Sequence, residues 1–232
     1  MPVEVYLICH STAVVACGEM TLLFDYSEKV CGRAVRELTV RALSGRSTVA
    51  LFSHAHGDHF DIAVRTLPGV ELFVLPPDVP ESEEKLLTPS IKVKVRDERE
   101  LPGGLSLKTY PSTDEGVAYL IEGPNGGRVF FAGDLALWAW PGDEEEDIRK
   151  AIEEWKSILK EVSKELVDVA FLVADPRLPH LGGFEEALDA LKPRHAFPIH
   201  NFGNLEYLKR LWREGVHVPT SLGEKFRLIL PF

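Results

Sequence analysis

Glutamine is absent from the 232-residue sequence, and asparagine occurs only three times. Charged residues, by contrast, make up 27% of the chain. A shortage of thermolabile amides together with many charges is typical of proteins from thermophiles, although a bias in genome composition produces the same profile. We therefore expect a heat-stable protein.

Long apolar runs are also missing, and cysteine is scarce. A membrane-spanning helix needs about 20 apolar residues, so we expect no membrane contact. The first residues lack the basic region and apolar core of a secretory signal. The three cysteines, Cys9, Cys17 and Cys31, form no Cys-x-x-Cys pair, and an odd number favours a reducing compartment. We expect a cytoplasmic protein with three buried, inert thiols.

The sequence has no excess of basic residues, since its formal net charge is −10. Extended docking onto nucleic acid needs clustered Lys and Arg, so we expect no nucleic-acid partner. A small anionic substrate remains compatible with this charge, because a bound cation reverses the local field. The length suits a single layered domain over residues 1–232, and nothing in the sequence indicates the oligomeric state.

Apolar patterns divide the chain into two strand-rich halves, each with helices. This order predicts an α+β fold, a four-layer αββα sandwich. The expected strands are 3–8, 13–16, 21–24, 48–52, 70–75, 91–95, 105–110, 117–122, 128–132, 168–174, 196–199 and 226–230. The expected helices are 32–43, 61–67, 184–191, 205–213 and a long one whose apolar face runs from Ile148 to Leu166.

The strongest chemical signal follows the expected strand 48–52, where three imidazoles and a carboxylate fall within six residues: His54, His56, Asp58 and His59. On an extended strand end, His54 and His56 project the same way and share one ion, while Gly57 turns the chain. Asp58 and His59 then face a second ion. The alternative is a His-rich surface loop, which the preceding buried strand disfavours.

The run Ser-His-x-His-x-Asp-His resembles the hallmark of the metallo-β-lactamase superfamily. Later landmarks follow in order: Asp134 resembles the carboxylate that bridges two metals, and His200 resembles the last ligand. Asp25 matches an early Asp that braces the cluster. The resemblance covers nearly the whole chain and is closest to the branch of L-ascorbate-6-phosphate lactonase-like proteins. The segments 112–116 and 175–178 look like one prokaryotic subgroup of that branch.

The resemblance implies two divalent ions, with Zn favoured and Mn or Fe as alternatives. One ion is held by His54, His56 and Asp114, and the other by Asp58, His59 and His200, with Asp134 between them. The family usually has a histidine where this chain has Asp114. A carboxylate is an acceptable ligand there, and it biases the site toward harder ions. Alternatively, Asp114 caps a loop, and the first ion has only two protein ligands and the bridge.

Other residues carry weaker signals. His10 either contacts the ligands or substrate, or is simply a buried, hydrogen-bonded histidine. Arg177 either grips a carboxylate or phosphate, or pairs with Asp175. Trp138 and Trp140 either line the pocket or only pack in the core. His180 lies in a loop that could close over the site but is more simply a solvent-exposed residue, and we interpret His195 and His217 as structural.

These features predict a metal-dependent hydrolase in which a metal-bridging hydroxide attacks a small ester, lactone, amide or phosphoester metabolite. We assign catalytic roles to Asp58, as the proton carrier, and to His10 and Arg177. Two alternatives are a nuclease or phosphodiesterase of the same superfamily and a redox iron enzyme on the same scaffold. The nuclease is disfavoured because such relatives usually keep the histidine replaced by Asp114 and add an arm or domain.

Overall fold

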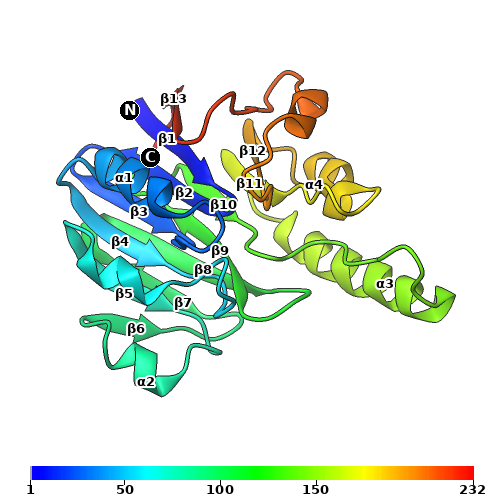
Figure 1. The fold of residues 1–232 in the computed structure, drawn as a ribbon, viewed down its shortest axis with the longest axis horizontal. Coiled ribbons are helices and arrows are strands. Elements are labelled where there is room, and N and C mark those ends of the chain that lie inside the picture. The colour runs from blue at the N-terminus through cyan, green and yellow to red at the C-terminus, as the bar shows by residue number, and fades with distance from the viewer. Residues whose placement is uncertain (1) are drawn as a thin grey trace.

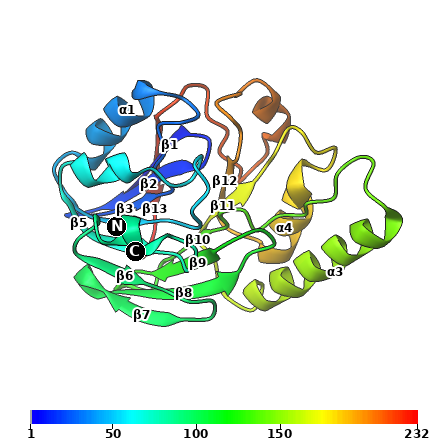
Figure 2. The same ribbon diagram turned by 60° about the horizontal axis from the view of Figure 1, so that its bottom comes forward.

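The computed structural model describes residues 2–232, and in it two mixed β-sheets pack face to face between helices (Figures 1 and 2). The first sheet has the order β13 (Glu224–Ile229), β1 (Pro2–Cys9), β2 (Thr12–Cys17), β3 (Met20–Phe24), β4 (Ser47–Leu51), β5 (Val70–Leu75) and β6 (Ser90–Lys92). The second has the order β12 (His195–Ile199), β11 (Val169–Val173), β10 (Arg128–Phe131), β9 (Val117–Glu122), β8 (Leu105–Pro111) and β7 (Glu98–Leu101).

The helices cover the outer faces of the sheets. Helix α1 (Arg33–Leu43) lies on the first sheet, and α3 (Glu145–Val162) and α4 (Phe184–Leu191) lie on the second (Figure 2). Short helical turns complete the structure: α2 (Glu81–Glu84), η1 (Ile62–Thr66), η2 (Pro102–Gly104), η3 (Leu181–Gly183) and η4 (Tyr207–Leu211). The α+β αββα architecture expected from the sequence is confirmed. No helix of residues 2–232 is long and apolar enough to cross a bilayer.

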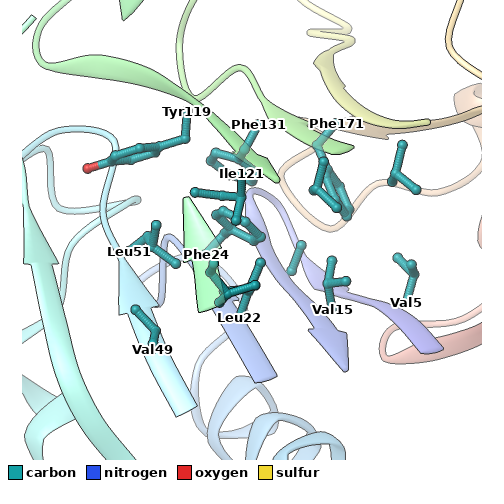
Figure 3. Packing of buried hydrophobic residues seen from close by; sticks show 14 of the residues in the cluster. Val5, Val15, Leu22, Phe24, Val49, Leu51, Tyr119, Ile121, Phe131 and Phe171 are labelled. Carbon is teal, nitrogen blue, oxygen red and sulfur yellow. The ribbon is translucent and has the colours of Figure 1, made fainter. Parts of the chain in front are cut away.

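The central core fills the space between the two sheets, because every second side chain of each strand points inward. Phe24 stacks on Phe131 with ring centroids 4.5 Å apart, and Phe171 lies 5.8 Å from Phe131 (Figure 3). Outward-facing side chains of the central strands are buried too, under α1 on one side and under α3 and α4 on the other, whereas those of the edge strands β7 and β13 are largely exposed. Each fully buried large apolar side chain contributes roughly 1.5–3 kcal/mol, so the sheets form a rigid platform.

Some local expectations are wrong. The segments 61–67 and 205–213 form only the 3₁₀ turns η1 and η4. The long helix ends at Val162, so Leu166 lies beyond it and is 79% exposed. The polar strand β7 was not expected, because its exposed side chains show no apolar alternation and it forms through pairing with β8.

The expectation of three inert thiols is also wrong. Cys9, at the end of β1, forms a disulfide with Cys31, and their Cα atoms are 6.4 Å apart. Only Cys17 is free, and it is buried. The pairing depends on how the loop after β3 folds back over the end of β1, which spacing along the chain does not reveal.

The strand directions bring several loops to one edge. β3 and β4 are parallel, and β1 shares their direction because β1 and β3 are both antiparallel to β2. In the second sheet, β10, β11 and β12 are parallel to one another. Carboxyl ends of parallel strands meet at the same edge, and loops there commonly build binding sites on a rigid scaffold.

Candidate metal centre

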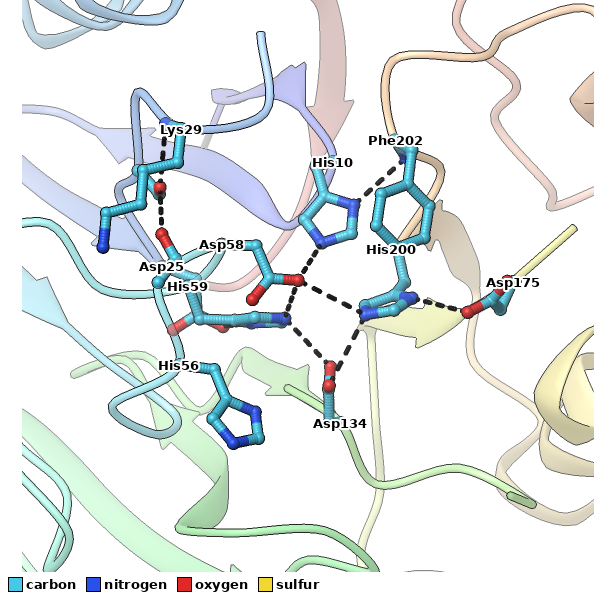
Figure 4. Close-up of polar contacts among 12 residues, drawn as sticks. His10, Asp25, Lys29, His56, Asp58, His59, Asp134, Asp175, His200 and Phe202 are labelled. Carbon is cyan, nitrogen blue, oxygen red and sulfur yellow. Dashed lines mark hydrogen bonds and ion pairs between the residues drawn. The ribbon is translucent and has the colours of Figure 1, made fainter. Parts of the chain in front are cut away.

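The residues that follow these strand ends converge on one cluster (Figure 4). It receives His10 after β1, Asp25 after β3, residues 53–59 after β4, Asp134 after β10 and His200 after β12. Within residues 2–232, all three groups of side chains that are close enough to hold an ion belong to this cluster. The groups are His54, His59 and Asp134; His10, Asp58, His59 and His200; and His54, His56 and Asp114.

Asp25 anchors the start of the motif, as expected of a bracing carboxylate. Its Oδ1 accepts the backbone N–H of Ser53 at 2.7 Å, and its Oδ2 accepts the Ser53 hydroxyl at 2.6 Å. The same Oδ2 lies 2.7 Å from His59 Nδ1. Asp25 and His59 are both fully buried, so these contacts fix the motif and the imidazole of His59 against the sheet.

Two further imidazoles are held through Nδ1 in the same way. Ser53 donates its one hydroxyl proton to Asp25, so its oxygen accepts from His54 Nδ1, 2.9 Å away. His200 Nδ1 lies 3.0 Å from Oδ2 of the buried Asp175. An imidazole whose Nδ1–H donates to such a partner keeps a free electron pair on Nε2, which is the usual arrangement of a metal-ligating histidine.

The three Nε2 atoms face the carboxylate of Asp134 instead of a hydrogen-bond donor. The distances from Nε2 to the nearest Asp134 oxygen are 3.7 Å for His54, 3.2 Å for His59 and 3.4 Å for His200. His54 Nε2, His59 Nε2 and Asp134 Oδ1 are buried and have no hydrogen-bond partner among the described residues. Electron pairs of buried acceptors facing one another need a cation between them, so this donor set fits a metal.

The proposed ligand Asp114 lies beside His56 at the more open side of the cluster. Its Oδ2 is 3.4 Å from His56 Nδ1, and the two side chains are 35% and 47% exposed. Glu115 Oε2, which was not expected at the site, lies 3.7 Å from His56 Nε2. His54, His56 and Asp114 are therefore close enough to share an ion, although nothing behind His56 fixes its ring as firmly as the rings of the buried histidines.

His10 is buried and lies against Asp58. Its Nδ1 accepts the backbone N–H of Phe202 at 3.1 Å, so the ring proton must be on Nε2. That Nε2–H points at Asp58 Oδ2, 3.2 Å away. A protonated nitrogen cannot bind a metal, so His10 positions Asp58 rather than acting as a ligand itself. Asp58 Oδ2 also lies 3.7 Å from His59 Nε2 and 4.0 Å from His200 Nε2.

The cluster separates the pKa values of its histidines. Burial opposes the charge on His200, but the Asp134 and Asp175 carboxylates outweigh it and raise the pKa of His200 to about 9. Burial lowers the pKa of His10 to about 4, since the single contact with Asp58 does not offset desolvation. Burial opposes the charged form of Asp134 as well, yet His59 and His200 hold its pKa far below the usual range.

Two glycines allow the loops to approach one another. A Cβ on Gly116, which has φ +72°, would lie 1.9 Å from the carbonyl oxygen of Ser53. A Cβ on Gly133, which has φ +55°, would lie 2.4 Å from Cβ of Ser53. The segments that present Asp114 and Asp134 thus touch the start of the histidine motif directly. His10, Asp25, His200 and Phe202 also have positive φ, as strained residues at functional sites often do.

A pocket of about 370 Å³ opens onto the cluster. Trp138 and Trp140 form part of its wall, with nearly parallel rings 6.1 Å apart, as one of the two interpretations of these residues predicted. Arg177 pairs with Asp175 and also lines the pocket. Phe202 was missed, because a lone phenylalanine beyond a strand gives no signal of its own. The further lining residues are His56, Asp58, Thr113, Asp114, Asp134 and His200.

The other histidines lie outside the cluster. Half-buried His180 donates from Nε2 to the carbonyl of Ala139 at 3.1 Å, so it is not simply a solvent-exposed loop residue. His195 Nδ1 and His217 Nε2 are 2.8 Å apart, and this pair stacks beside Phe197, which agrees with a structural role.

Comparison with known proteins agrees with the fold expected from the sequence. No family model and no curated protein matches the sequence. Solved structures do match, and they show that the chain has the metallo-β-lactamase fold. One is Igni18, a metallo hydrolase from the archaeon Ignicoccus hospitalis, with 17% identity, coverage of 99% of both chains and a TM-score of 0.66.

Two other structures share the fold. The metallo-beta-lactamase fold protein YhfI from Bacillus subtilis is 12% identical, with a TM-score of 0.65 and coverage of 98% of this chain and 100% of that chain. CmlA, a diiron beta-hydroxylase from Streptomyces venezuelae, is 14% identical, with a TM-score of 0.64 and coverage of 98% of this chain and 54% of that chain. The fold thus occurs with more than one chemistry.

Proposed function

We propose that this protein is a metal-dependent hydrolase of a small ester, lactone, amide or phosphoester, with two divalent ions in the cluster. The observation that carries the proposal is the buried, unpartnered set of His54 Nε2, His59 Nε2 and Asp134 Oδ1. Such a set is costly to bury unless positive charge compensates it, and a bound metal ion would satisfy all three atoms at once. The metallo-hydrolase Igni18 and the L-ascorbate-6-phosphate lactonase-like branch, which the sequence resembles, support the same chemistry.

The proposed ligand sets follow from which side chains are close together. His54, His56 and Asp114 hold the first ion, Asp58, His59 and His200 hold the second, and Asp134 faces both sets. When bound, two such ions supply Lewis acidity and a water nucleophile of lowered pKa, about 7 in known hydrolases. A zinc pair suits the imidazoles, whereas the three carboxylates also accommodate Mn or Fe.

The protein's own residues then orient the reaction. His10 holds Asp58 Oδ2 with its Nε2–H, and Asp58 lines the pocket, so its carboxylate can accept a proton from the nucleophile and return it to the leaving group. Asp25, Asp175 and Ser53 keep the imidazoles in the tautomer that leaves Nε2 unprotonated. The pocket volume of about 370 Å³ suits a small molecule, which supports this substrate class.

The test begins with metal content. Protein expressed in rich medium and purified without chelator should contain about two equivalents of divalent metal by inductively coupled plasma mass spectrometry. His59→Ala should lose metal and turnover on a panel of esters, lactones, amides and phosphoesters, because it removes an inward-facing ligand. His195→Ala, outside the cluster, is the control. Full metal content in His59→Ala would contradict the proposal.

A redox iron enzyme is the second candidate. His54, His56 and Asp114 form a two-histidine, one-carboxylate set, which non-haem iron oxygenases also use, and the diiron beta-hydroxylase CmlA shares the fold. Reconstitution with Fe(II) under anaerobic conditions, followed by addition of oxygen, distinguishes the two functions. Oxygen consumption coupled to a change in the absorption spectrum would favour the oxygenase, and hydrolysis with Zn alone would favour the hydrolase.

A further inference from the structure

The guanidinium of Arg177 is hydrogen-bonded within the protein on one edge and free on the other. Its Nε donates to both oxygens of Asp175 at 3.0 Å, and its Nη2 donates to Oδ2 at 2.5 Å. A guanidinium has five N–H groups, so this side-on pair leaves three free, and two of them lie parallel along the outer Nη1–Nη2 edge. Nη1 makes no hydrogen bond within residues 2–232, and half of the Arg177 side chain is exposed. The outer edge is therefore available to a ligand.

The guanidinium is also held in place. Its central carbon lies 4.5 Å from the ring centroid of Phe202 and 5.1 Å from that of Trp140. The partner Asp175 is fully buried and also contacts His200, so its carboxylate holds the guanidinium in a fixed position. Contacts with two aromatic rings and a buried carboxylate remove most of the rotamer freedom of the arginine, which lowers the cost of ordering it on binding.

The position of Arg177 relates this edge to the candidate metal centre. Arg177 lines the same pocket as Asp58, Asp114 and Asp134, and it is the only lysine or arginine among the described residues that line it. Once those three carboxylates hold divalent ions, their negative charge no longer offsets the positive charge of Arg177. The buried Asp175 divides its own charge between His200 and Arg177. An anionic oxygen at the free edge would therefore meet a net attractive field.

Resting on the proposed function, we propose that Arg177 selects substrates that carry a carboxylate or phosphate group in addition to the bond that is cleaved. The free Nη1–Nη2 edge binds the anion through a fork of N–H groups. The paired rings of Trp138 and Trp140 form an adjacent flat wall against which the middle of the substrate packs. Arg177 thus acts as a specificity-determining residue rather than as an acid or base.

The experiment compares two esters with the same leaving group, 4-nitrophenyl pentanoate and mono-4-nitrophenyl glutarate, on the metal-loaded protein. The ratio of kcat/KM for the acidic ester to that for the neutral ester should fall about tenfold or more in Arg177→Met. Arg177→Lys should give an intermediate ratio, because it keeps the charge but loses the fork. Arg194→Met is the control, since Arg194 is 69% exposed and pairs only with Asp168 among the described residues. An unchanged ratio in Arg177→Met would overturn the proposal.

A binding measurement separates this proposal from the proposed function. Tryptophan fluorescence, reported by Trp138 and Trp140 in the pocket, follows titration of the metal-loaded protein with glutarate and, separately, inorganic phosphate. Saturable binding by the wild type that weakens about tenfold in Arg177→Met supports the anion site even if neither ester is hydrolysed. A stronger response to one of the two anions identifies the group that the site prefers. No difference between wild type and Arg177→Met overturns the proposal.

Discussion

At the scale of single residues, a few hydrogen bonds decide whether the Nε2 atom of a histidine in the cluster is free to bind a metal ion. His54, His59 and His200 each give Nδ1 to a partner behind the ring, so Nε2 remains free to face the centre. His10 has the opposite arrangement, because its Nδ1 accepts an amide proton. Within a few ångströms, histidine thus presents a free Nε2 to the centre at three positions and a protonated Nε2 to a carboxylate at a fourth.

Asp114 provides the sharpest test of the ligand assignment. Asp114→Ala should reduce the bound metal from about two equivalents to about one, because the second ligand set lacks this carboxylate. Asp114→His should keep about two equivalents and shift the preference toward Zn. Metal content measured after dialysis against metal-free buffer checks both outcomes. Two full equivalents in Asp114→Ala would show that neither ion needs this carboxylate.

The raised pKa of His200 predicts pH-dependent metal affinity. In the metal-free protein, its pKa of about 9 means that Nε2 is protonated at neutral pH, and a metal must displace that proton. Affinity should therefore rise by about tenfold per pH unit up to about pH 9 and then level off. Competition with a chelating dye at several pH values measures this. In Asp175→Asn, the metal affinity should level off at a lower pH. Equal metal affinity at pH 7 and pH 9 in the wild type would contradict the assignment of His200 as a metal ligand.

At the scale of elements, the strands supply the scaffold, and the loops at their carboxyl ends carry the candidate metal ligands. The apolar runs predicted most strands well, because alternation and burial are local properties of the sequence. The failures came where local signals are weak. Strand β7 is polar, and the turns η1 and η4 are too short and too irregular to continue as α-helices.

Close contact between two of these loops predicts a large effect of Gly116→Ala. The new Cβ would collide with the Ser53 carbonyl, and φ is +72°, so the free energy of unfolding should fall by about 2–4 kcal/mol. Gly126→Ala is a matched control, because Gly126 has φ +86° but open space around its Cβ position, and it should lose only about 1 kcal/mol. Urea denaturation of both variants measures the difference. Equal losses would show that the backbone conformation, not the contact, requires the glycine.

At the scale of the whole molecule, the disulfide joins the end of β1 to the loop after β3, next to the cluster. It closes a loop with a sequence separation of 22 residues. Cys31→Ser should cost about 3 kcal/mol and lower Tm by roughly 6–12 °C, since a free loop has more unfolded conformations. Calorimetry with and without reductant checks this. Reductant should lower the Tm of the wild type but not that of Cys31→Ser, and equal Tm values would contradict a stabilising role.

Heat stability itself stays a prediction from composition. The charged residues form many ion pairs on the surface, such as Arg96 with Glu161 and Arg128 with Glu165. Isolated exposed pairs contribute little at room temperature, and their value grows only in networks and at high temperature. Thermal denaturation would decide whether the shortage of amides reflects adaptation to heat.

The fold and the main candidates for metal binding could be predicted from the amino-acid sequence, because both leave local patterns in it. Alternating apolar residues define the strands, and the spacing within His54–His59 places several donors on one short segment. Which distant residues complete the cluster, and which atoms they contact, became apparent from the three-dimensional arrangement. It placed Asp175 behind His200, Phe202 against His10 and Arg177, and Cys31 on Cys9. Those contacts join segments far apart in the chain, and they form only when parallel strands bring their ends to one edge of the sandwich.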